Sequence, residues 1–493
     1  MKSSFRLFIA LLLFLVCGSS SYADTDEWTL LSTPNFEFYA QYDAQRARAK
    51  LEYFEVYRYA VYAMLGLDPN VKLAPMRIYA FSDSNDYSEI RGNMNAAGFY
   101  NSSGPYLVIG PEESSIEDNF VLFHEYLHYI VRASVPYQYP TWYDEGLATF
   151  FGVVEIDDDS ITFGSRPEHY MRYLKYSGTL SFQKLIEQTN QSKSQDKTDN
   201  YQYKFYVSSW LATHYLIAGE FNGEKNYNPQ LQQYLRLFNE GINSSQAFEQ
   251  AFNIKPEEFN KTLIGYAKKR RNTAMRMARP KINLKVTESS VSDAEAALFY
   301  SQLTYKRIPE VNQKYFQIAL QNKVSLALAY EANNAALQGD FSYSDAMLNE
   351  ALSSDKKTWE THLHIAKTYI TLAKKRNEQS LYTKAYAQLL IAENLKVTAS
   401  VYRTLAEVAW SLGQRQKAID YAIAQYQMEP SGVHANHVAG YYMVEAGKTE
   451  YGRFFLNNVI NWTHSEPTKK RAQKLLDKIN QLTIEAVDTK RDK

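Results

Sequence analysis

Hydrophobic and polar residues alternate along several short stretches of the first hundred residues. The two-residue period appears in TLLSTPNFEFYA and MRIYAFSD and predicts strands with one buried face, while PYLVIGP predicts a short buried strand. From Asp43 to Leu65 the apolar residues recur near helical spacing, with Gly66 as the expected stop. A loop is expected in the Gly- and Asn-rich stretch GNMNAAGFYNSSG. The pattern therefore indicates a small sheet accompanied by a helix.

The chain becomes mainly helical after Ser115. Residues 115 to 118 resemble a capping box that opens a helix through VLFHEYLHYIV, and Pro136 and Pro140 separate this helix from a second one, PTWYDEGLATFF. A β-hairpin is expected in VVEIDDDSITFG, and helical spacing returns in FYVSSWLATHYLI. Between these two stretches, the polar run from Gln188 to Asn200 predicts a mobile loop.

A basic stretch, AKKRRNTAMRMARPK, and the polar segment after it predict a domain boundary near residues 275 to 290, and the basic residues are expected to be a solvated helix end. Beyond the boundary the pattern is helical and it repeats: Ala399 to Gly432 spans 34 residues, the period of a tetratricopeptide repeat. The positions that this repeat reserves for aromatic, small and turn residues are filled by Tyr402, Leu405, Ala406, Gly413, Ala418 and Pro430. A second unit keeps small residues at Ala439, Gly440 and Gly447. The alternative is a generic helical bundle.

The first 23 residues have the organisation of an export signal. Lys2 and Arg6 precede an uncharged apolar run that is too short for a comfortable membrane span, and Ser21-Tyr22-Ala23 offers a cleavage site after Ala23. Cys17 is the only cysteine, so the mature chain is expected to hold no thiol and no disulfide. These features favour a bacterial periplasmic or secreted protein. An uncleaved anchor and a lipoprotein modified at Cys17 are the alternatives.

Composition narrows the classes of partner. Hydrophobic residues make up 45% of the 493 positions, which is enough for sizeable cores in two or three domains. Lys and Arg together number 54, as do Asp and Glu, so the formal net charge of zero gives no reason to expect a nucleic-acid partner or a polybasic membrane contact. No membrane span is expected once the signal is removed.

Two histidines and a glutamate interrupt the apolar stretch VLFHEYLHYIV. His124 and His128 are four residues apart and project from the same face of a helix, and Glu125 lies close enough to reach a group that both imidazoles hold. Burying these groups without partners would be costly, and a zinc ion removes that cost because neutral imidazole nitrogens are good zinc ligands. This HExxH spacing predicts two zinc ligands and a general base on one helical turn.

A third zinc ligand is expected on the following helix. Glu145 lies 17 residues after His128, and a turn at Pro136–Pro140 would fold its helix back against the first. Asp144 and Glu155 are the rival carboxylates. Asp144 points about 100 degrees away from Glu145 around a helix, and Glu155 falls in the predicted hairpin, so Glu145 is preferred.

HEYLH followed by WYDEGLATFFG resembles the gluzincin metallopeptidases, and in particular the bacterial peptidase MA-like families. FYVSSWLATHYL is similar to the helix that follows their zinc site, and GINSSQAFEQAFNIKPEEFNKTLIGYAKK to their closing helices, so the resemblance covers about Trp28 to Lys269. It implies an α+β fold of the thermolysin type, with a small mixed sheet and a helical part, and zinc held by His124, His128 and Glu145.

One feature of related enzymes is missing. Aminopeptidases of this clan carry a Gly-x-Met-Glu-Asn strand before HExxH, whose Glu anchors the free amine of the substrate. The corresponding region, GPYLVIGPEES, has no such motif, and Glu112 and Glu113 are expected to be loop carboxylates rather than substitutes. The sequence therefore favours an endopeptidase over amino-terminal trimming.

The same resemblance suggests a second catalytic residue. Gluzincins of the aminopeptidase type supply a Tyr hydroxyl to the carbonyl oxygen that becomes negatively charged, and Tyr206, 61 residues after Glu145, matches that position. Tyr203, His214 and Tyr215 are the competitors, and ordinary helix packing is the alternative for Tyr206 itself.

Together these expectations describe an exported zinc peptidase that hydrolyses a peptide or protein substrate, with Glu125 as general base and Tyr206 as the other catalytic residue. Two other classes stay open: a periplasmic binding or assembly factor whose helical repeats dock a protein partner, and a zinc hydrolase of a cell-envelope component. The expected organisation is a signal peptide at 1–23, a gluzincin-like metallopeptidase domain at 24–280 and an all-α tetratricopeptide-like domain at 288–485.

Overall fold

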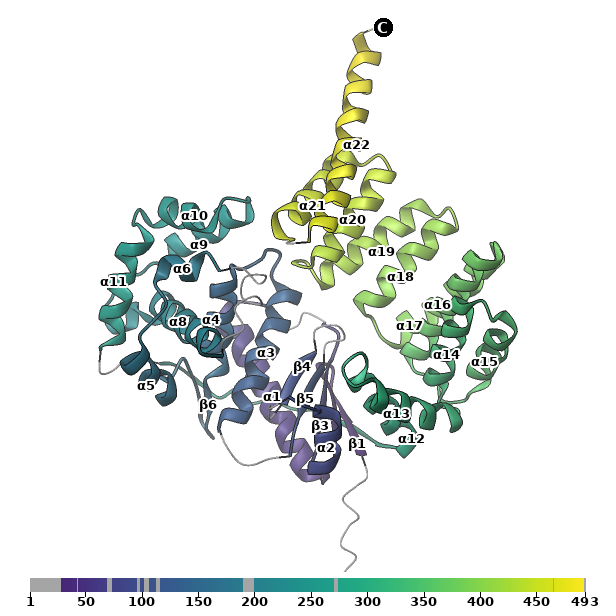
Figure 1. Ribbon diagram of the computed structural model, residues 1–493, viewed down its shortest axis with the longest axis horizontal. Coiled ribbons are helices and arrows are strands. Elements are labelled where there is room, and N and C mark those ends of the chain that lie inside the picture. The colour runs from purple at the N-terminus through teal and green to yellow at the C-terminus, as the bar shows by residue number, and fades with distance from the viewer. Residues whose placement is uncertain are drawn as a thin grey trace, which may run out of the picture.

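The computed structural model describes residues 28–41, 43–68, 73–94, 98–101, 106–111, 116–188, 199–269, 274–463 and 465–491. They form a mixed α and β structure that is mainly helical (Figure 1), which confirms the coarse α+β prediction. Several predictions lie outside the described residues: the signal peptide with Ala23 and Cys17, the carboxylates Glu112 and Glu113, and residues 189–198 of the polar loop. No helix among the described residues is both long and apolar enough to cross a membrane.

A six-stranded mixed sheet lies in the N-terminal half, in the order β4-β5-β3-β2-β1-β9. Its strands are β1 (Trp28–Ser32), β2 (Phe36–Ala40), β3 (Met76–Ala80), β4 (Gly98–Asn101), β5 (Tyr106–Ile109) and β9 (Thr287–Val291). The central strands β2, β3 and β5 are parallel, and the outer pairs are antiparallel. Phe38, Ile78 and Leu107 lie side by side across the three central strands and are fully buried, so they form one apolar row of the core.

Two strands of this sheet were not predicted. The loop expected in GNMNAAGFYNSSG is wrong at Gly98–Asn101, which form the edge strand β4. β9 has the polar sequence TESSV and pairs with β1 at the other edge, at the end of the predicted domain boundary near residues 275 to 290. Residues 288–291 of β9 fall in the domain predicted to be all-α, so that part of the prediction is wrong for these residues, because they pair with β1. The division into two domains stays a prediction.

A second, three-stranded antiparallel sheet has the order β6-β7-β8. β6 (Val154–Ile156) and β7 (Ser160–Phe163) form the predicted hairpin. β8 (Met275–Ala278) pairs with β7 and lies in the basic stretch. The solvated helix end expected in this stretch is wrong for these four residues.

The helices of the N-terminal half are α1 (Ala44–Leu65), α2 (Ser84–Arg91), α3 (Ile116–Ser134), α4 (Thr141–Gly152), α5 (Glu168–Ser177), α6 (Phe182–Ile186), α8 (Asp199–Ala218), the short 3-10 helix η1 (Glu220–Asn222), α9 (Asn228–Asn239), α10 (Ser244–Phe252) and α11 (Pro256–Ala267). α1 ends at Gly66 as predicted, where a left-handed residue with φ of 65° closes the last turn. The Tyr57 ring stacks on Phe123 at 4.0 Å between centroids, and its hydroxyl donates to the Phe123 carbonyl at 3.0 Å. These contacts hold α3 against α1.

The rest of the chain is an array of helices. They are α12 (Asp293–Thr304), α13 (Pro309–Gln321), α14 (Ser325–Gln338), α15 (Phe341–Ser353), α16 (Trp359–Arg376), α17 (Ser380–Leu395), α18 (Ala399–Ser411), α19 (Arg415–Met428), α20 (Val433–Glu445), α21 (Thr449–Trp462) and α22 (Glu466–Arg491). Consecutive helices pack as pairs, including α18 with α19 and α20 with α21, so the two helix pairs expected in residues 399–463 are present. A Cβ at Gly440 would lie 2.9 Å from Leu456, because α20 and α21 cross closely there.

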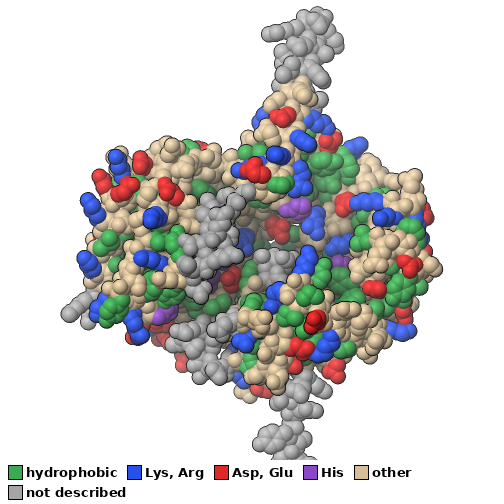
Figure 2. Space-filling model, viewed as in Figure 1, with side chains coloured by type: hydrophobic (Ala, Val, Ile, Leu, Met, Phe, Trp, Pro, Cys, Tyr) green, Lys and Arg blue, Asp and Glu red, His purple; other side chains and the backbone are tan. Residues whose placement is uncertain are grey.

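The helical array curves back onto the N-terminal half (Figure 1). Its later helices contact α3 and α9. Ser431 donates from Oγ to the Arg132 carbonyl at 3.1 Å and accepts from Gln138 at its own carbonyl at 3.0 Å. Asn461 donates to the Asn239 carbonyl at 3.2 Å. The later helices of the array thus contact the N-terminal half, and the two halves together bound a cavity of about 1380 Å³, visible as the hollow at the centre of Figure 2.

Candidate metal centre

Helices α3 and α4 bring three potential metal ligands together. His124 and His128 project from one face of α3, as predicted, and are 7% and 4% exposed. Glu145, in the first half of α4, places Oε2 3.2 Å from Nε2 of His124 and 3.5 Å from Nε2 of His128. One ligand atom from each residue lies within 4.8 Å of the other two, so this group can hold a metal ion.

Two glycines allow α4 to approach its neighbours closely. A Cβ at Gly146 would clash with Thr213 and with the Ser209 backbone of α8, and a Cβ at Gly152 would lie 3.2 Å from Cβ of His124. The side of α4 that carries Glu145 is therefore fixed against α3 and α8 together. Small residues at these two positions explain how a helix otherwise rich in large apolar side chains can present a carboxylate to the histidines.

The charges of the three groups are coupled. Burial alone would lower the pKa of His128, but the carboxylates of Asp144 and Glu145 outweigh it and raise the pKa to about 10. Burial opposes the charged form of Glu145 as well, yet contacts with His124 and His128 hold its pKa well below the usual range. Without a metal, the centre therefore favours a carboxylate beside protonated imidazole, and a metal cation would have to displace that proton.

Asp144, the rival ligand in the sequence, lies on the far side of His128. Its Oδ2 atom is 3.2 Å from Nδ1 of His128, the ring nitrogen that does not face Glu145. The distance is that of an ion pair, although Nδ1 has no aligned hydrogen-bond acceptor among the described residues. Asp144 is thus placed to orient His128. The other rival, Glu155, lies exposed in β6.

Among Tyr203, Tyr206, His214 and Tyr215, the candidates for stabilising the carbonyl oxygen, Tyr206 on α8 packs against the candidate ligand His124. Its ring centroid is 6.1 Å from that of His124, at an interplanar angle of 71°. Tyr203 packs instead against Tyr170 and Tyr173. Tyr215 is 2% exposed and lies in an aromatic cluster with Tyr227, Phe259 and Tyr266.

His214 has a structural environment of its own. It is fully buried, Nε2 lies 3.0 Å from the Gly164 carbonyl, and Nδ1 lies 2.9 Å from the Tyr266 hydroxyl. A carbonyl can only accept, so Nε2 carries the proton and Nδ1 accepts from Tyr266 in the neutral ring. Burial lowers the pKa of His214 to about 4, which keeps the ring neutral. Both nitrogens are occupied, so neither is available for the role in which His214 competes with Tyr206.

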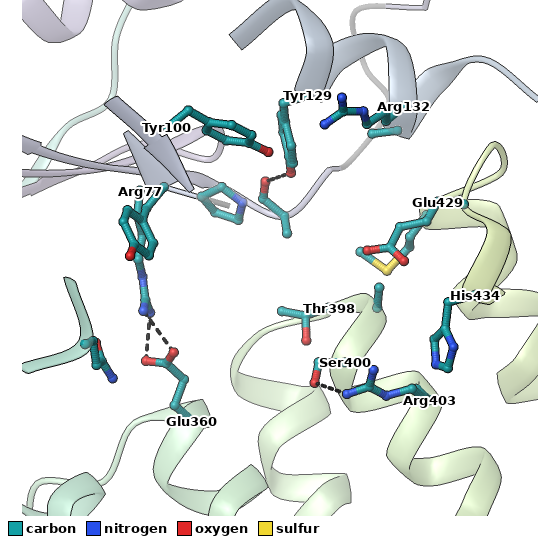
Figure 3. Close-up of a pocket in the computed structure, with 18 of the residues that line it drawn as sticks. Arg77, Tyr100, Tyr129, Arg132, Glu360, Thr398, Ser400, Arg403, Glu429 and His434 are labelled. Carbon is teal, nitrogen blue, oxygen red and sulfur yellow. Dashed lines mark hydrogen bonds and ion pairs between the residues drawn. The ribbon is translucent and has the colours of Figure 1, made fainter. Parts of the chain in front are cut away.

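Glu125, the predicted base, is partly buried on α3. Tyr100 of β4 also lies near Glu125, and the sequence analysis did not predict it as a site residue. Burial raises the pKa of Tyr100, Arg132 opposes the shift, and the negative charge of Glu125 adds to it, so the three side chains lie within electrostatic range. Tyr100 and Arg132 also line the central cavity (Figure 3). The lining residues Tyr100 and Arg132 therefore lie near Glu125, which is not itself part of the described lining.

Comparison with known proteins adds no assignment. No protein-family model matches the chain, and no curated protein matches it significantly. The resemblance to the peptidase MA-like families therefore depends on the motifs around His124 and Glu145 and on the segments that follow them.

Proposed function

We propose that the chain is a zinc-dependent peptidase of the gluzincin type. The zinc ion would be held by the predicted ligands His124, His128 and Glu145. The observation that carries the proposal is the convergence of two imidazole nitrogens and one carboxylate oxygen at 3.2 and 3.5 Å. Ligands bound to a tetrahedral zinc ion at about 2.0–2.1 Å lie about 3.3 Å from one another. The donor set is also the one that catalytic zinc sites use, with a fourth position left for water or substrate.

The protein residues would perform the following roles in peptide hydrolysis. When bound, zinc lowers the pKa of water toward about 7 and polarises the scissile carbonyl. Glu125 accepts a proton from the attacking water and donates it to the leaving amine. Tyr206 donates a hydrogen bond to the carbonyl oxygen as negative charge develops on it. Asp144 keeps the ring of His128 oriented, so that Nε2 faces the metal.

The finer classification of the two halves belongs to the same proposal. We assign the N-terminal half, with its mixed sheet beside α3 and α4, to the thermolysin-like gluzincins. The paired helices from α14 to α21 are assigned to the tetratricopeptide-like repeats, supported by the small residues at the crossing of α20 and α21. Export to the periplasm and cleavage after Ala23 complete the proposal and depend on the sequence of residues 1–23 alone.

The experiment is a cleavage assay with a library of unstructured peptides. Full-length protein and the Glu125→Gln variant are compared after zinc loading, with a panel of cell-envelope glycans as a second substrate set. Cleavage of peptides by the wild type and its loss in Glu125→Gln is the expected result. Glycan turnover without peptide cleavage would replace the peptidase by a zinc hydrolase of another class, and no turnover of either set would favour a binding or assembly factor.

A further inference from the structure

The central cavity is lined by both halves of the molecule and adjoins the metal centre. Its described lining includes β3, β4, α3 and α4 on one side and α12, α16, α18 and the α19–α20 turn on the other. Asp144 reaches the cavity and also lies 3.2 Å from His128. The cavity therefore reaches the candidate metal centre at Asp144, on the side of His128 that faces away from Glu145.

The lining is basic although the chain as a whole is neutral. Among the described lining residues there are seven lysines and arginines and three carboxylates, whereas Lys and Arg together equal Asp and Glu, at 54 each, over the full sequence. Such an excess of one sign in a concave, partly enclosed site concentrates ligands of the opposite charge.

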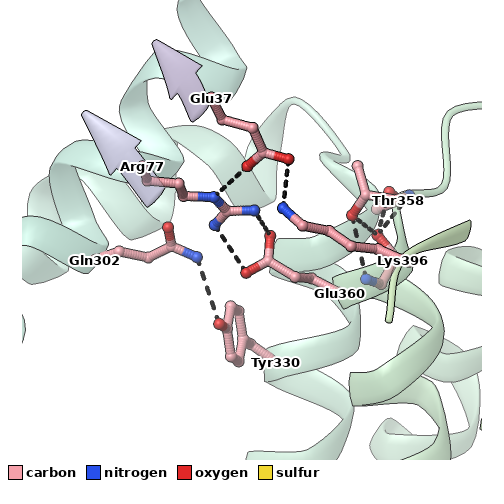
Figure 4. A network of polar contacts seen from close by, with 9 residues as sticks. Glu37, Arg77, Gln302, Tyr330, Thr358, Glu360 and Lys396 are labelled. Atoms are coloured by element: carbon pink, nitrogen blue, oxygen red, sulfur yellow. Dashed lines mark hydrogen bonds and ion pairs between the residues drawn. The ribbon is translucent and has the colours of Figure 1, made fainter. Parts of the chain in front are cut away.

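Two of these cations are already neutralised by a network at the edge of the cavity (Figure 4). Arg77 donates to Glu37 at 2.7 Å and to both oxygens of Glu360 at 2.8 and 2.9 Å. Lys396 pairs with the other oxygen of Glu37 at 2.5 Å. These four residues join the sheet to α16 and the end of α17, and they leave no cation of the network unpaired.

Three other cations of the lining have no such ion-pair partners. Among the described residues, no carboxylate lies within ion-pair distance of Arg132, Lys367 or Arg403; the contact recorded for the Arg403 guanidinium is a long one of 3.5 Å to Ser400 Oγ. Figure 3 places Arg132 and Arg403 on different walls, with the Glu429 carboxylate pointing into the space between them. Most of the five N–H donors of Arg403 are therefore available to a ligand.

The electrostatics of the neighbours agree with an unneutralised cluster. Burial lowers the pKa of Lys367 to about 8, the positive charge of Arg403 adds to the effect, and the charge of Glu360 on the same helix opposes it. Burial raises the pKa of Glu429 despite the attraction of Arg403, so the charged form of the nearby carboxylate is itself disfavoured. A bound anion would relieve the repulsion between Lys367 and Arg403.

We propose that the cavity binds a carboxylate of a peptide, with Arg403 as its planar, two-pronged partner and Lys367 as the second cation. The guanidinium fork matches carboxylate geometry, and the aromatic side chains that line the cavity, among them Tyr129, Tyr137 and Trp359, provide room and contact area for neighbouring peptide side chains. The peptide nature of the ligand rests on the proposed function of the adjoining metal centre. The carboxylate is that of the chain terminus or of an acidic side chain, which share the same chemistry.

The test measures binding without turnover. Calorimetric titrations use the full chain carrying Glu125→Gln and three ten-residue peptides. The first has a neutral last residue and a free C-terminal carboxylate, and the second has the same last residue with an amidated C-terminus. The third has Asp as its last residue and an amidated C-terminus. The free acid, the Asp amide or both are expected to bind at least about tenfold more tightly than the neutral amide. Which of the two is preferred separates the chain terminus from a side chain as the source of the carboxylate.

Three further variants locate the site. Arg403→Gln and Lys367→Gln are expected to reduce the preference for the carboxylate peptides to within about twofold. Lys374→Gln, on the same helix as Lys367 but paired with Glu407 at 2.6 Å outside the cavity, should leave the preference unchanged. Equal binding of all three peptides, a preference that survives both cavity substitutions, or tighter binding of an anionic oligosaccharide than of any peptide would overturn the proposal. Because turnover is absent from the assay, a preference found in a chain that cleaves no peptide would contradict the proposed function and not the carboxylate site.

Discussion

The Oδ2 atom of Asp144 lies 3.2 Å from Nδ1 of His128, while Nε2 of the same imidazole lies 3.5 Å from Glu145. The adjacent carboxylates of α4 therefore contact the two nitrogens of one ring. Glu145 lies close to Nε2 of both histidines, and Asp144 orients the His128 ring through its other nitrogen, Nδ1. A metal ligand whose second nitrogen contacts a carboxylate is held in orientation and made more basic.

Replacing Asp144 by Asn should weaken metal binding without abolishing it. The expected loss is about 10- to 100-fold in zinc affinity, the usual effect of removing a group that orients a ligand. Competition with a chelating dye measures the affinity. Glu155→Gln, which changes an exposed carboxylate in β6, is the control and should bind zinc as the wild type does; equal affinity in both variants would remove Asp144 from the centre.

Replacing Tyr206 by Phe should leave zinc content and substrate affinity intact and lower turnover by about a hundredfold or more, the scale reported for one lost donor to the developing negative charge. Tyr203 lies three residues earlier on α8 and packs on Tyr173 at 4.8 Å between ring centroids. The matched change Tyr203→Phe should therefore keep its turnover. If Tyr203→Phe loses activity and Tyr206→Phe does not, the role belongs to Tyr203.

Replacing Gly146 by Ala should destabilise the N-terminal half by about 1–3 kcal/mol, because the added methyl group would be forced against Thr213 and the Ser209 backbone where α4 crosses α8. Gly265→Ala is the matched control. Gly265 is an exposed residue of α11 with nothing within 4 Å of its added Cβ, and alanine there should stabilise the helix by up to about 1 kcal/mol. Thermal unfolding should show a lower stability for Gly146→Ala and an equal or higher stability for Gly265→Ala. A Gly146→Ala protein as stable as the wild type would show that α4 and α8 can move apart at no cost in stability.

The buried ring of His214 predicts a pH dependence of stability. Its pKa is about 4 in the folded chain, against an ordinary value of 6.5, because burial disfavours the charged ring. Between these values the unfolded chain binds more protons than the folded one, so stability is fully present above pH 6.5 and falls as the pH decreases toward 4. The contribution is about 3 kcal/mol over this range. The free energy of unfolding is measured with denaturant at pH 7 and pH 4. The decrease between the two pH values should be smaller by that amount in His214→Asn than in the wild type. An equal decrease in both proteins would show that another group causes the pH dependence.

Local sequence patterns were sufficient for the elements that carry the candidate metal ligands. The four-residue spacing of His124 and His128 fixes their common face on any helix, and the Pro-rich turn at residues 136–140 returns α4 against α3. Strands β4 and β9 were missed for a physical reason. Both are edge strands, and β9 is exposed along most of its length, so backbone pairing forms it without any alternation of apolar side chains.

The contacts between distant segments could not be predicted. Asp144 was considered only as a competing ligand, because the side from which it approaches His128 depends on how α4 packs on α3. The return of the helical array onto α3 depends on Ser431 and Gln138, two ordinary polar residues. For the same reason the basic cavity is not visible in the sequence: Arg132, Lys367 and Arg403 come from three separate helices and meet only when the array has closed.

The metal content of the purified protein tests the central claim most directly. Elemental analysis by mass spectrometry is applied to the wild type, His128→Ala, Glu145→Gln and Glu125→Gln after identical zinc loading and removal of unbound metal. The account predicts about one zinc ion per chain in the wild type and in Glu125→Gln, since the base is not a ligand, and little or none in the other two. Equal zinc in all four proteins, or none in the wild type, would contradict the assignment of His124, His128 and Glu145 as a zinc centre.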